Sequence, residues 1–219
     1  MYPGRVNSVI VGAGQSGLAM SAHLRNHCID HVVLERDSIA ERWRNARWDS
    51  LVMNGPAWHD RFPALRFNSD PNGFPSKDEV TRYFEDFAKK IQAPIHCGVE
   101  VISTTARPDG GYQVETSNGN IHADHVIAAT GPFQIPLIPS IVPDGAVSQM
   151  HSFDYQNPQQ LQDGAVLVVG AGSSGAQIAT ELLESGRKVY LSIGAHDRPP
   201  RSYRGKDFVW WLGALGKWQ

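Results

Sequence analysis

The sequence predicts an α/β protein, with a Rossmann-like dinucleotide-binding fold, a β-meander insertion and the start of a second Rossmann unit. Three observations predict this fold. A glycine-rich turn at residues 12–17 lies between a short apolar run and a helical pattern, and residues 170–175 repeat that arrangement. Between the two turns, short alternating runs are separated by turn residues, as in antiparallel strands. The expected domain boundaries are 1–160 for the first unit and 161–219 for the beginning of the second.

The first βαβ unit is predicted from three segments near the N-terminus. Residues 6–11 form a short apolar run, which is typical of a buried parallel strand. Residues 18–26 have helical spacing, and residues 31–34 form the next apolar run. The polar and aromatic stretch 37–66 has few regular signals, and so long a connection inside a compact domain is often functional.

A helix and a meander are predicted to follow. Residues 77–91 place their apolar side chains on one helical face, and Ser76 is a suitable N-cap. Residues 100–107 and 112–117 alternate around a Pro-Asp-Gly-Gly turn, which predicts a hairpin. A further turn and a strand over 125–129 close the meander.

The second βαβ unit is predicted after a proline-rich connector. Its segments are a strand over 166–169, a helix over 176–185 and a strand over 188–192. Two copies of one βαβ unit at this long separation differ from the short period of a solenoid.

Composition excludes several classes of protein. The chain has 219 residues, 41% hydrophobic and 19% charged, as in a globular protein with a core. The net charge of −2 gives no basic surplus for nucleic acid. No apolar run is long enough to span a bilayer, and no apolar signal region precedes the first strand, so a cytoplasmic location is expected. Cys28 and Cys97 form no CxxC pair, which argues against the dithiol centre of disulfide reductases.

The first glycine turn carries the residues that a dinucleotide site needs. Gly12 permits the tight turn, Gly14 lets backbone approach a pyrophosphate, and Gly17 lets helix and strand pack closely. The phosphates then lie on the helix N-terminus, where free N–H groups favour an anion. Glu35, at the end of the next strand, is placed to accept hydrogen bonds from a ribose.

The second glycine turn favours NADPH. A strand-by-strand alignment of the two units places Ser192 where Glu35 stands in the first. A hydroxyl there tolerates a 2′-phosphate that a carboxylate would repel, and arginine side chains suit phosphate. The basic residues that follow are Arg198, Arg201, Arg204 and Lys206, although each can equally belong to a solvated loop.

Three further motifs occur along the chain: residues 43–56, which include Trp-Asp-Ser-Leu-Val-Met-Asn-Gly-Pro, residues 74–80, and Ala-Thr-Gly at 129–131. Together with the two glycine turns, these motifs resemble the flavin-containing monooxygenases and their bacterial relatives over nearly the whole chain. The family's fingerprint before the second turn is met at His151 and Tyr155. Gly145 and Val147 stand where that fingerprint has Phe and Gly, which fits the broader class B monooxygenase group better.

The resemblance implies that FAD and NADPH are the cofactors. It also implies that one oxygen atom from O₂ is transferred to a small organic substrate through a C4a-peroxyflavin. Asn54 matches the asparagine near the flavin C4a–N5 edge and is the candidate catalytic residue, while Asn-Gly-Pro is also an ordinary turn sequence. The expected FAD contacts are Gly12, Gly14, Ser16, Gly17, Glu35, Arg36, Trp43, Arg44, Thr130 and Gly131. The expected NADPH contacts are Gly170, Gly172, Ser173, Ser174, Gly175, Ser192, Arg198 and Arg201. No metal is expected.

Two alternatives stay open: another pyridine nucleotide–flavin oxidoreductase, and a truncated nucleotide-binding fragment without activity. The residues after 165 are too few for a second Rossmann domain and a return to the first, since one βαβ unit takes about 30 residues. The apolar segments 208–212 and 215–218 predict self-association through the C-terminus. The expectation is therefore weak flavin binding and little oxygenation by this chain alone.

Overall fold

A computed structural model describes residues 4–143, 145–195, 197 and 199–217. The chain forms two compact units, one made of Met1–Ala46 and Asp78–Ile141 and the other of Arg47–Lys77 and Val142–Gln219. This division differs from the expected boundary at residue 160. The irregular segment after the first βαβ unit belongs with the second glycine turn and not with the first.

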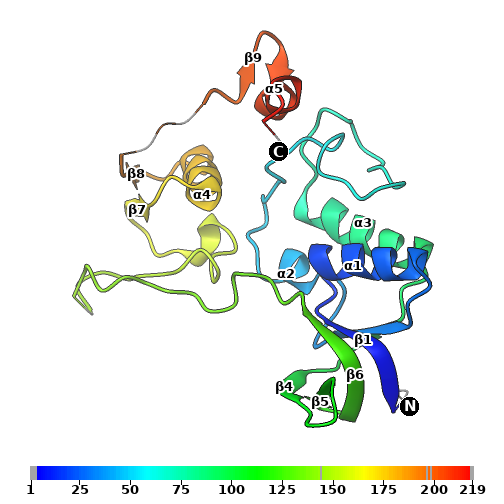
Figure 1. Ribbon diagram of the computed structural model, residues 1–219. Coiled ribbons are helices and arrows are strands. Elements are labelled where there is room, and N and C mark those ends of the chain that lie inside the picture. The colour runs from blue at the N-terminus through cyan, green and yellow to red at the C-terminus, as the bar shows by residue number, and fades with distance from the viewer. Residues whose placement is uncertain (1–3, 144, 196, 198, 218–219) are drawn as a thin grey trace. The chain divides into compact units, whose positions relative to one another are not determined.

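The first unit is built on one six-stranded sheet in the order β3-β2-β1-β6-β5-β4 (Figure 1). The four strands β3, β2, β1 and β6 are parallel, and β5 and β4 are antiparallel to their neighbours. The strands are β1 (Arg5–Val11), β2 (His31–Glu35), β3 (Ile95–Cys97), β4 (Val101–Ala106), β5 (Tyr112–Thr116) and β6 (Gly119–Ala128). The helices are α1 (Gln15–Asn26), α2 (Glu41–Arg44) and α3 (Lys77–Lys90). The predicted α/β Rossmann-like fold is confirmed.

Both faces of the central strands β1 and β2 are buried, which explains their continuous apolar runs. On one face Ile10 and Val33 pack with Leu24 of α1. On the other face Val9 packs in one cluster with Val114 and Ile121 of the meander. Each fully buried Val or Ile contributes about 1.5–3 kcal/mol to folding, so these two clusters fix the position of β1 and of the turn that follows it.

The meander belongs to the main sheet. The sequence predicted a turn at 118–120 and a separate strand over 125–129, but β6 is one continuous ten-residue strand. Its first half pairs antiparallel with β5, and its second half pairs parallel with β1. The strand therefore delivers residues 129–131 directly beside the first glycine turn.

The second unit contains a smaller βαβ arrangement. β7 (Val166–Val169) and β8 (Val189–Ser192) form a two-stranded parallel sheet, connected through α4 (Ser173–Glu184). The hairpin strands β9 (Ser202–Tyr203) and β10 (Lys206–Asp207) and the helix α5 (Phe208–Ala214) follow, and η1 (Pro158–Gln160) precedes β7.

Segment 47–77 of this unit is ordered by a short antiparallel pairing of its own two ends. Met53 N donates to Pro75 O at 2.8 Å, and Lys77 N donates to Leu51 O at 3.0 Å. Trp48, just before this pairing, is only 2% exposed. The pairing explains how a stretch without regular sequence signals holds a defined conformation.

An ion pair also joins the two ends of segment 47–77. The Lys77 ammonium lies 2.8 Å from the Asp49 carboxylate, which also accepts from Asn157 at 2.9 Å. The hydrogen bond from Lys77 is the main cause that lowers the pKa of Asp49, and the bond from Asn157 is the next.

None of the helices in the described part of the chain combines the length and apolar character needed to cross a membrane.

Candidate functional site

Two glycines of the first turn are required by the chain's own packing. Gly12 has φ +107°, and a Cβ there would lie 2.6 Å from the Ala129 carbonyl oxygen. A Cβ on Gly17 would lie 1.9 Å from the carbonyl oxygen of Gly12, because α1 starts directly against the turn. Both distances are below any real Cβ contact, so no side chain fits at either position.

Gly14 is different, since a Cβ built there meets nothing within 4 Å. Packing within the chain therefore gives no reason for a glycine at this position. Gly14 is the N-cap of α1, which has no side-chain cap and no acidic residue in its first turn. Uncapped N–H groups next to open space suit the pyrophosphate of a dinucleotide, which needs close approach to backbone. The residues present thus fit such a cofactor.

Glu35 is held at the end of β2 by the backbone of the turn. Its Oε2 accepts from Ala13 N at 2.8 Å, and its Oε1 accepts from Asp37 N at 3.1 Å. The residue is half-buried, and each carboxylate oxygen keeps lone-pair capacity for a further donor. This arrangement suits a carboxylate that accepts hydrogen bonds from ribose hydroxyls.

The other residues expected near FAD are held in different ways. Arg36 pairs with Asp37 at 3.2 Å, and Arg44 pairs with Glu85 at 2.5 Å. Trp43 meets the edge of Phe84, with ring centroids 6.4 Å apart. Ser16 is exposed in the first turn of α1. Thr130 and Gly131 follow Ala129, whose N–H donates to Val11 O at 2.9 Å.

Cys97 lies opposite Glu35 in the β2–β3 pairing. Burial, and next the Glu35 carboxylate, raise the pKa of the Cys97 thiol. A raised pKa lowers the thiolate fraction at neutral pH, and the thiolate is the reactive form.

Alkylation measures this effect. In a Cys28→Ser chain, the pH midpoint for iodoacetamide reaction of Cys97 is expected above that of cysteine in an unfolded peptide. Glu35→Gln should move the midpoint down without restoring it fully, because burial, the larger cause, stays. A midpoint at or below the peptide value would contradict the inferred burial of Cys97 and its proximity to the Glu35 carboxylate.

The second glycine turn repeats the geometry of the first. Gly170 has φ +100°, and a Cβ on Gly175 would lie 1.9 Å from the Gly170 carbonyl oxygen. A Cβ on Gly172 meets nothing within 4 Å. Gly172 is the N-cap of α4, which has no side-chain cap and no acid in its first turn, the turn that contains Ser173 and Ser174. By contrast, Asp207 caps α5 by accepting from Val209 N at 2.8 Å.

The strand register corrects the alignment of the two units by one residue. Leu34 pairs opposite Val11 in the first unit, and Ser192 pairs opposite Val169 in the second. Gly12 N donates to Leu34 O, and Gly170 N donates in the same way to Ser192 O. Ser192 therefore corresponds to Leu34, and Ile193 corresponds to Glu35. The position still lacks an acid.

The basic residues expected near a 2′-phosphate lie on or beside the β9–β10 hairpin. Arg201 pairs with Asp207 at 2.9 Å, and its guanidinium lies over the Phe74 ring at 4.2 Å. Arg204 and Lys206 lie over the rings of Tyr203 and Trp210, at 5.3 and 5.5 Å. Each of these three cationic side chains therefore makes a cation–π contact with an aromatic ring. Arg198 lies outside the described residues.

Asn54 is exposed at the end of the paired segment. Its Oδ1 lies 3.5 Å from Nε2 of Gln177, a residue of α4 that carries no motif in the sequence. A Cβ on the next residue, Gly55, would lie 2.1 Å from the Asp60 carboxylate, so the turn after Asn54 is compact. The structure is consistent with both the turn role and a site role for Asn54.

Tyr155 and His151, the two matched fingerprint residues, have structural partners. Tyr155 is buried and its hydroxyl donates to Glu181 of α4 at 2.6 Å. Burial, and next the Glu181 carboxylate, raise the pKa of Tyr155. His151 Nδ1 accepts from Phe153 N at 3.0 Å. The Tyr155 bond attaches this segment to α4, whereas the His151 bond is local to the segment.

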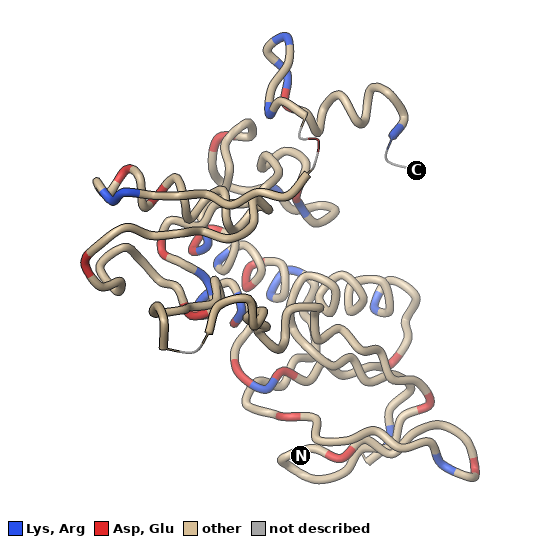
Figure 2. Tube along the Cα trace, turned by 90° about the vertical axis from the view of Figure 1, so that its left-hand side faces the viewer, with Lys and Arg blue, Asp and Glu red and all other residues tan. Residues whose placement is uncertain are grey.

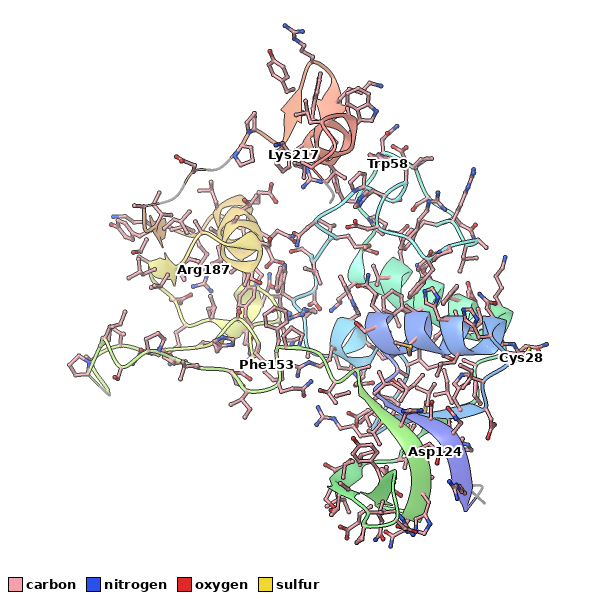
Figure 3. The ribbon with its side chains drawn as sticks, in the orientation of Figure 1. Cys28, Trp58, Asp124, Phe153, Arg187 and Lys217 are labelled. Atoms are coloured by element: carbon pink, nitrogen blue, oxygen red, sulfur yellow. The ribbon has the colours of Figure 1, made fainter. Side chains whose placement is uncertain are left out.

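The C-terminal helix carries exposed apolar surface. Trp210 is 40% exposed and Leu215 64% exposed. An apolar pocket of about 260 Å³ is lined by α5 residues and by Trp58, labelled in Figure 3. Trp218 lies outside the described residues, and self-association through this end stays a prediction.

Charge distribution adds no candidate site to the two glycine turns. Lys and Arg are interspersed with Asp and Glu along the trace (Figure 2). Within the described residues, no three His, Cys, Asp or Glu side chains gather where they could hold a metal ion. The two glycine turns are therefore the strongest candidate sites.

Comparison with known proteins agrees with the geometry of the turns. The family model described as pyridine nucleotide-disulphide oxidoreductase matches residues 9–212. A CzcO-like uncharacterized oxidoreductase from Geobacillus kaustophilus is 46% identical over 215 residues, which cover 96% of this chain and 61% of that protein. The chain thus spans about three fifths of the length of this relative.

Two further comparisons concern monooxygenases. The indole-3-pyruvate monooxygenase YUCCA1 of Oryza sativa subsp. japonica is 33% identical over 191 residues, covering 85% of this chain and 47% of that protein. The solved structure of a flavin-containing monooxygenase from Stenotrophomonas maltophilia superposes with a TM-score of 0.82 at 24% identity, covering 96% of this chain and 64% of that one. The expected resemblance to this group is confirmed.

Proposed function

The chain belongs to the pyridine nucleotide-disulphide oxidoreductase family, and we propose that it acts as an FAD- and NADPH-dependent monooxygenase. The observation that carries the proposal is the pair of glycine turns, each with an uncapped helix N-terminus and a central glycine that the chain's packing does not require. The likeness to proteins named as monooxygenases supports the finer assignment.

Residues of the first unit are proposed to bind FAD. The N–H groups at the start of α1 receive the pyrophosphate, and Gly14 leaves room for it. Glu35 accepts hydrogen bonds from the ribose of the adenosine half, while Ala13 N keeps its carboxylate oriented. When bound, the flavin supplies the redox chemistry with NADPH and O₂, and the protein supplies binding and orientation.

Residues of the second unit are proposed to bind NADPH. The start of α4 receives the pyrophosphate beside Gly172. Ile193, at the position of Glu35, leaves no carboxylate to repel a 2′-phosphate. Asn54 is proposed to donate a hydrogen bond at the reacting edge of the flavin. Its support is the sequence resemblance and the exposure of its side chain.

Cofactor titration tests the assignment. The chain is expected to bind FAD at least about tenfold more tightly than FMN, because only FAD carries the adenosine ribose that Glu35 recognises; tenfold corresponds to about 1.4 kcal/mol. Glu35→Gln should shrink this preference, and Asp124→Asn, an exposed change at the Arg5 ion pair, should leave it unchanged. Equal affinity for FAD and FMN in the wild type would refute the proposal.

A second candidate, reduction of a disulfide substrate, follows from the family's description. The two cysteines argue against a protein dithiol in that role. Cys28 follows α1 and Cys97 ends β3, both are free thiols, and burial raises the pKa of the Cys97 thiol. NADPH oxidation that needs added disulfide and leaves O₂ unconsumed would favour this candidate.

A further inference from the structure

We propose that Gln177 of α4 is a positioning residue for Asn54, holding the strand that leads to it in place. Gln177 forms two hydrogen bonds to the backbone of Val52, and we call this pair of bonds the clamp. The role of Asn54 at the flavin rests on the function proposed above, whereas the clamp is a property of the chain alone. It joins two residues 125 positions apart in sequence, through both amide atoms of one side chain.

The clamp closes the second edge of a short strand. On its first edge, this strand is hydrogen-bonded to residues 75–77: Lys77 N donates to Leu51 O, and Met53 N donates to Pro75 O. Backbone groups alternate in direction along an extended strand, so the N–H and C=O of Val52 point away from that pairing. Gln177 takes both of them: its Oε1 accepts from Val52 N at 3.2 Å, and its Nε2 donates to Val52 O at 3.0 Å.

A carboxamide can make both bonds at neutral pH, because it carries a donor and an acceptor on one planar group. A glutamate would accept from Val52 N but could not donate to Val52 O, and a leucine would do neither. Val52 and Gln177 are both half-buried, so unpaired backbone groups there would carry a free-energy cost. The glutamine thus acts as a substitute for a neighbouring strand.

The same side chain also orients Asn54. Gln177 Nε2 lies 3.5 Å from Asn54 Oδ1, at the long limit of a hydrogen bond. This contact uses the oxygen of the Asn54 amide and does not use its nitrogen. The N–H group of that nitrogen is the donor that the proposed role of Asn54 requires.

The position of Gln177 links this strand to the second glycine turn. Gln177 is two residues beyond Gly175, near the N-terminus of the helix whose free N–H groups are proposed to receive the NADPH pyrophosphate. One rigid helix therefore carries both the phosphate site and the clamp. Binding of NADP⁺ at α4 should consequently increase the order of residues 51–54.

Amide hydrogen exchange on the isotope-labelled chain, without cofactor, tests the clamp. Gln177→Leu should speed exchange of the Val52 amide about fivefold to tenfold, as expected for loss of one net hydrogen bond, and should shift the Asn54 side-chain amide resonances. Gln177→Glu keeps the acceptor, so it should protect Val52 better than Gln177→Leu and still shift the Asn54 resonances. If Gln177→Leu does not fold, Gln177→Glu alone tests the clamp through the shift of the Asn54 resonances.

Thr180→Ala is the matched control on the same helix, since the exposed Thr180 hydroxyl donates to Ala176 O of α4 itself. It should change neither signal. NADP⁺ should slow Val52 exchange in the wild type and in Thr180→Ala, but not in Gln177→Leu. Unchanged Val52 exchange in Gln177→Leu, or an equal change in Thr180→Ala, would overturn the clamp. Failure of FAD binding in the wild type would instead overturn the proposed function and leave the cofactor-free result intact.

Discussion

Gly17→Ala is expected to abolish folding of the first unit, whereas Gly14→Ala is expected to fold normally and to bind FAD poorly. The new Cβ at residue 17 would lie 1.9 Å from the Gly12 carbonyl oxygen, while the one at residue 14 meets nothing within 4 Å. A backbone clash of this size should cost more than about 4 kcal/mol. The methyl group at residue 14 should cost about 1 kcal/mol or less in stability.

The loss of FAD affinity in Gly14→Ala follows from the space that the ligand needs. A methyl group in that space keeps the pyrophosphate away from the α1 amides, so affinity should fall about tenfold or more. Thermal unfolding and FAD titration measure the two effects separately. Gly175→Ala and Gly172→Ala provide the same contrast for NADPH in the second unit. Normal FAD affinity in Gly14→Ala would contradict the assigned role of the first turn.

Ile193→Glu is expected to reverse the preference of the second unit from NADPH to NADH. The strand register places Ile193 where Glu35 stands in the first unit, so a carboxylate there would repel the 2′-phosphate. Like-charge juxtaposition costs several kcal/mol, and NADPH affinity should fall about a hundredfold while NADH is spared. Titration with NADPH and NADH, followed by tryptophan fluorescence, measures both affinities.

Ser192→Asp is the matched comparison, because it places a charge one residue earlier, at the position of Leu34. Its effect on NADPH should be the smaller of the two. A larger effect for Ser192→Asp would restore the alignment made from sequence alone. Equal wild-type affinity for NADPH and NADH would contradict the assigned specificity.

The parts of the fold that sequence could predict are those with local signals. The two βαβ units were recognisable because an apolar run, a glycine turn and a helical pattern occur in succession. β3 was missed because three residues, Ile95–Cys97, are too short to show a period. The double pairing of β6 was missed because turn residues at its start looked like a break, whereas tertiary pairing on both halves keeps it extended.

The candidate site shows the same limit. The glycines and Glu35 could be proposed from spacing, because the role proposed for each depends on a local backbone geometry. The choice between Ser192 and Ile193 depends on which strand residues pair, and an alignment by strand ends cannot resolve a shift of one residue. Gln177 carries no local signal at all, since its partners are Val52 and Asn54, far away in sequence.

A crystal structure of the chain with FAD would show whether the first glycine turn binds the cofactor. We expect pyrophosphate oxygens within hydrogen-bonding distance of the N–H groups that begin α1, close to the Gly14 Cα, and ribose hydroxyls on the Glu35 carboxylate. The Glu35 bond to Ala13 N should be retained in that complex. FAD bound elsewhere, or bound with its pyrophosphate away from this turn, would contradict the proposed FAD site.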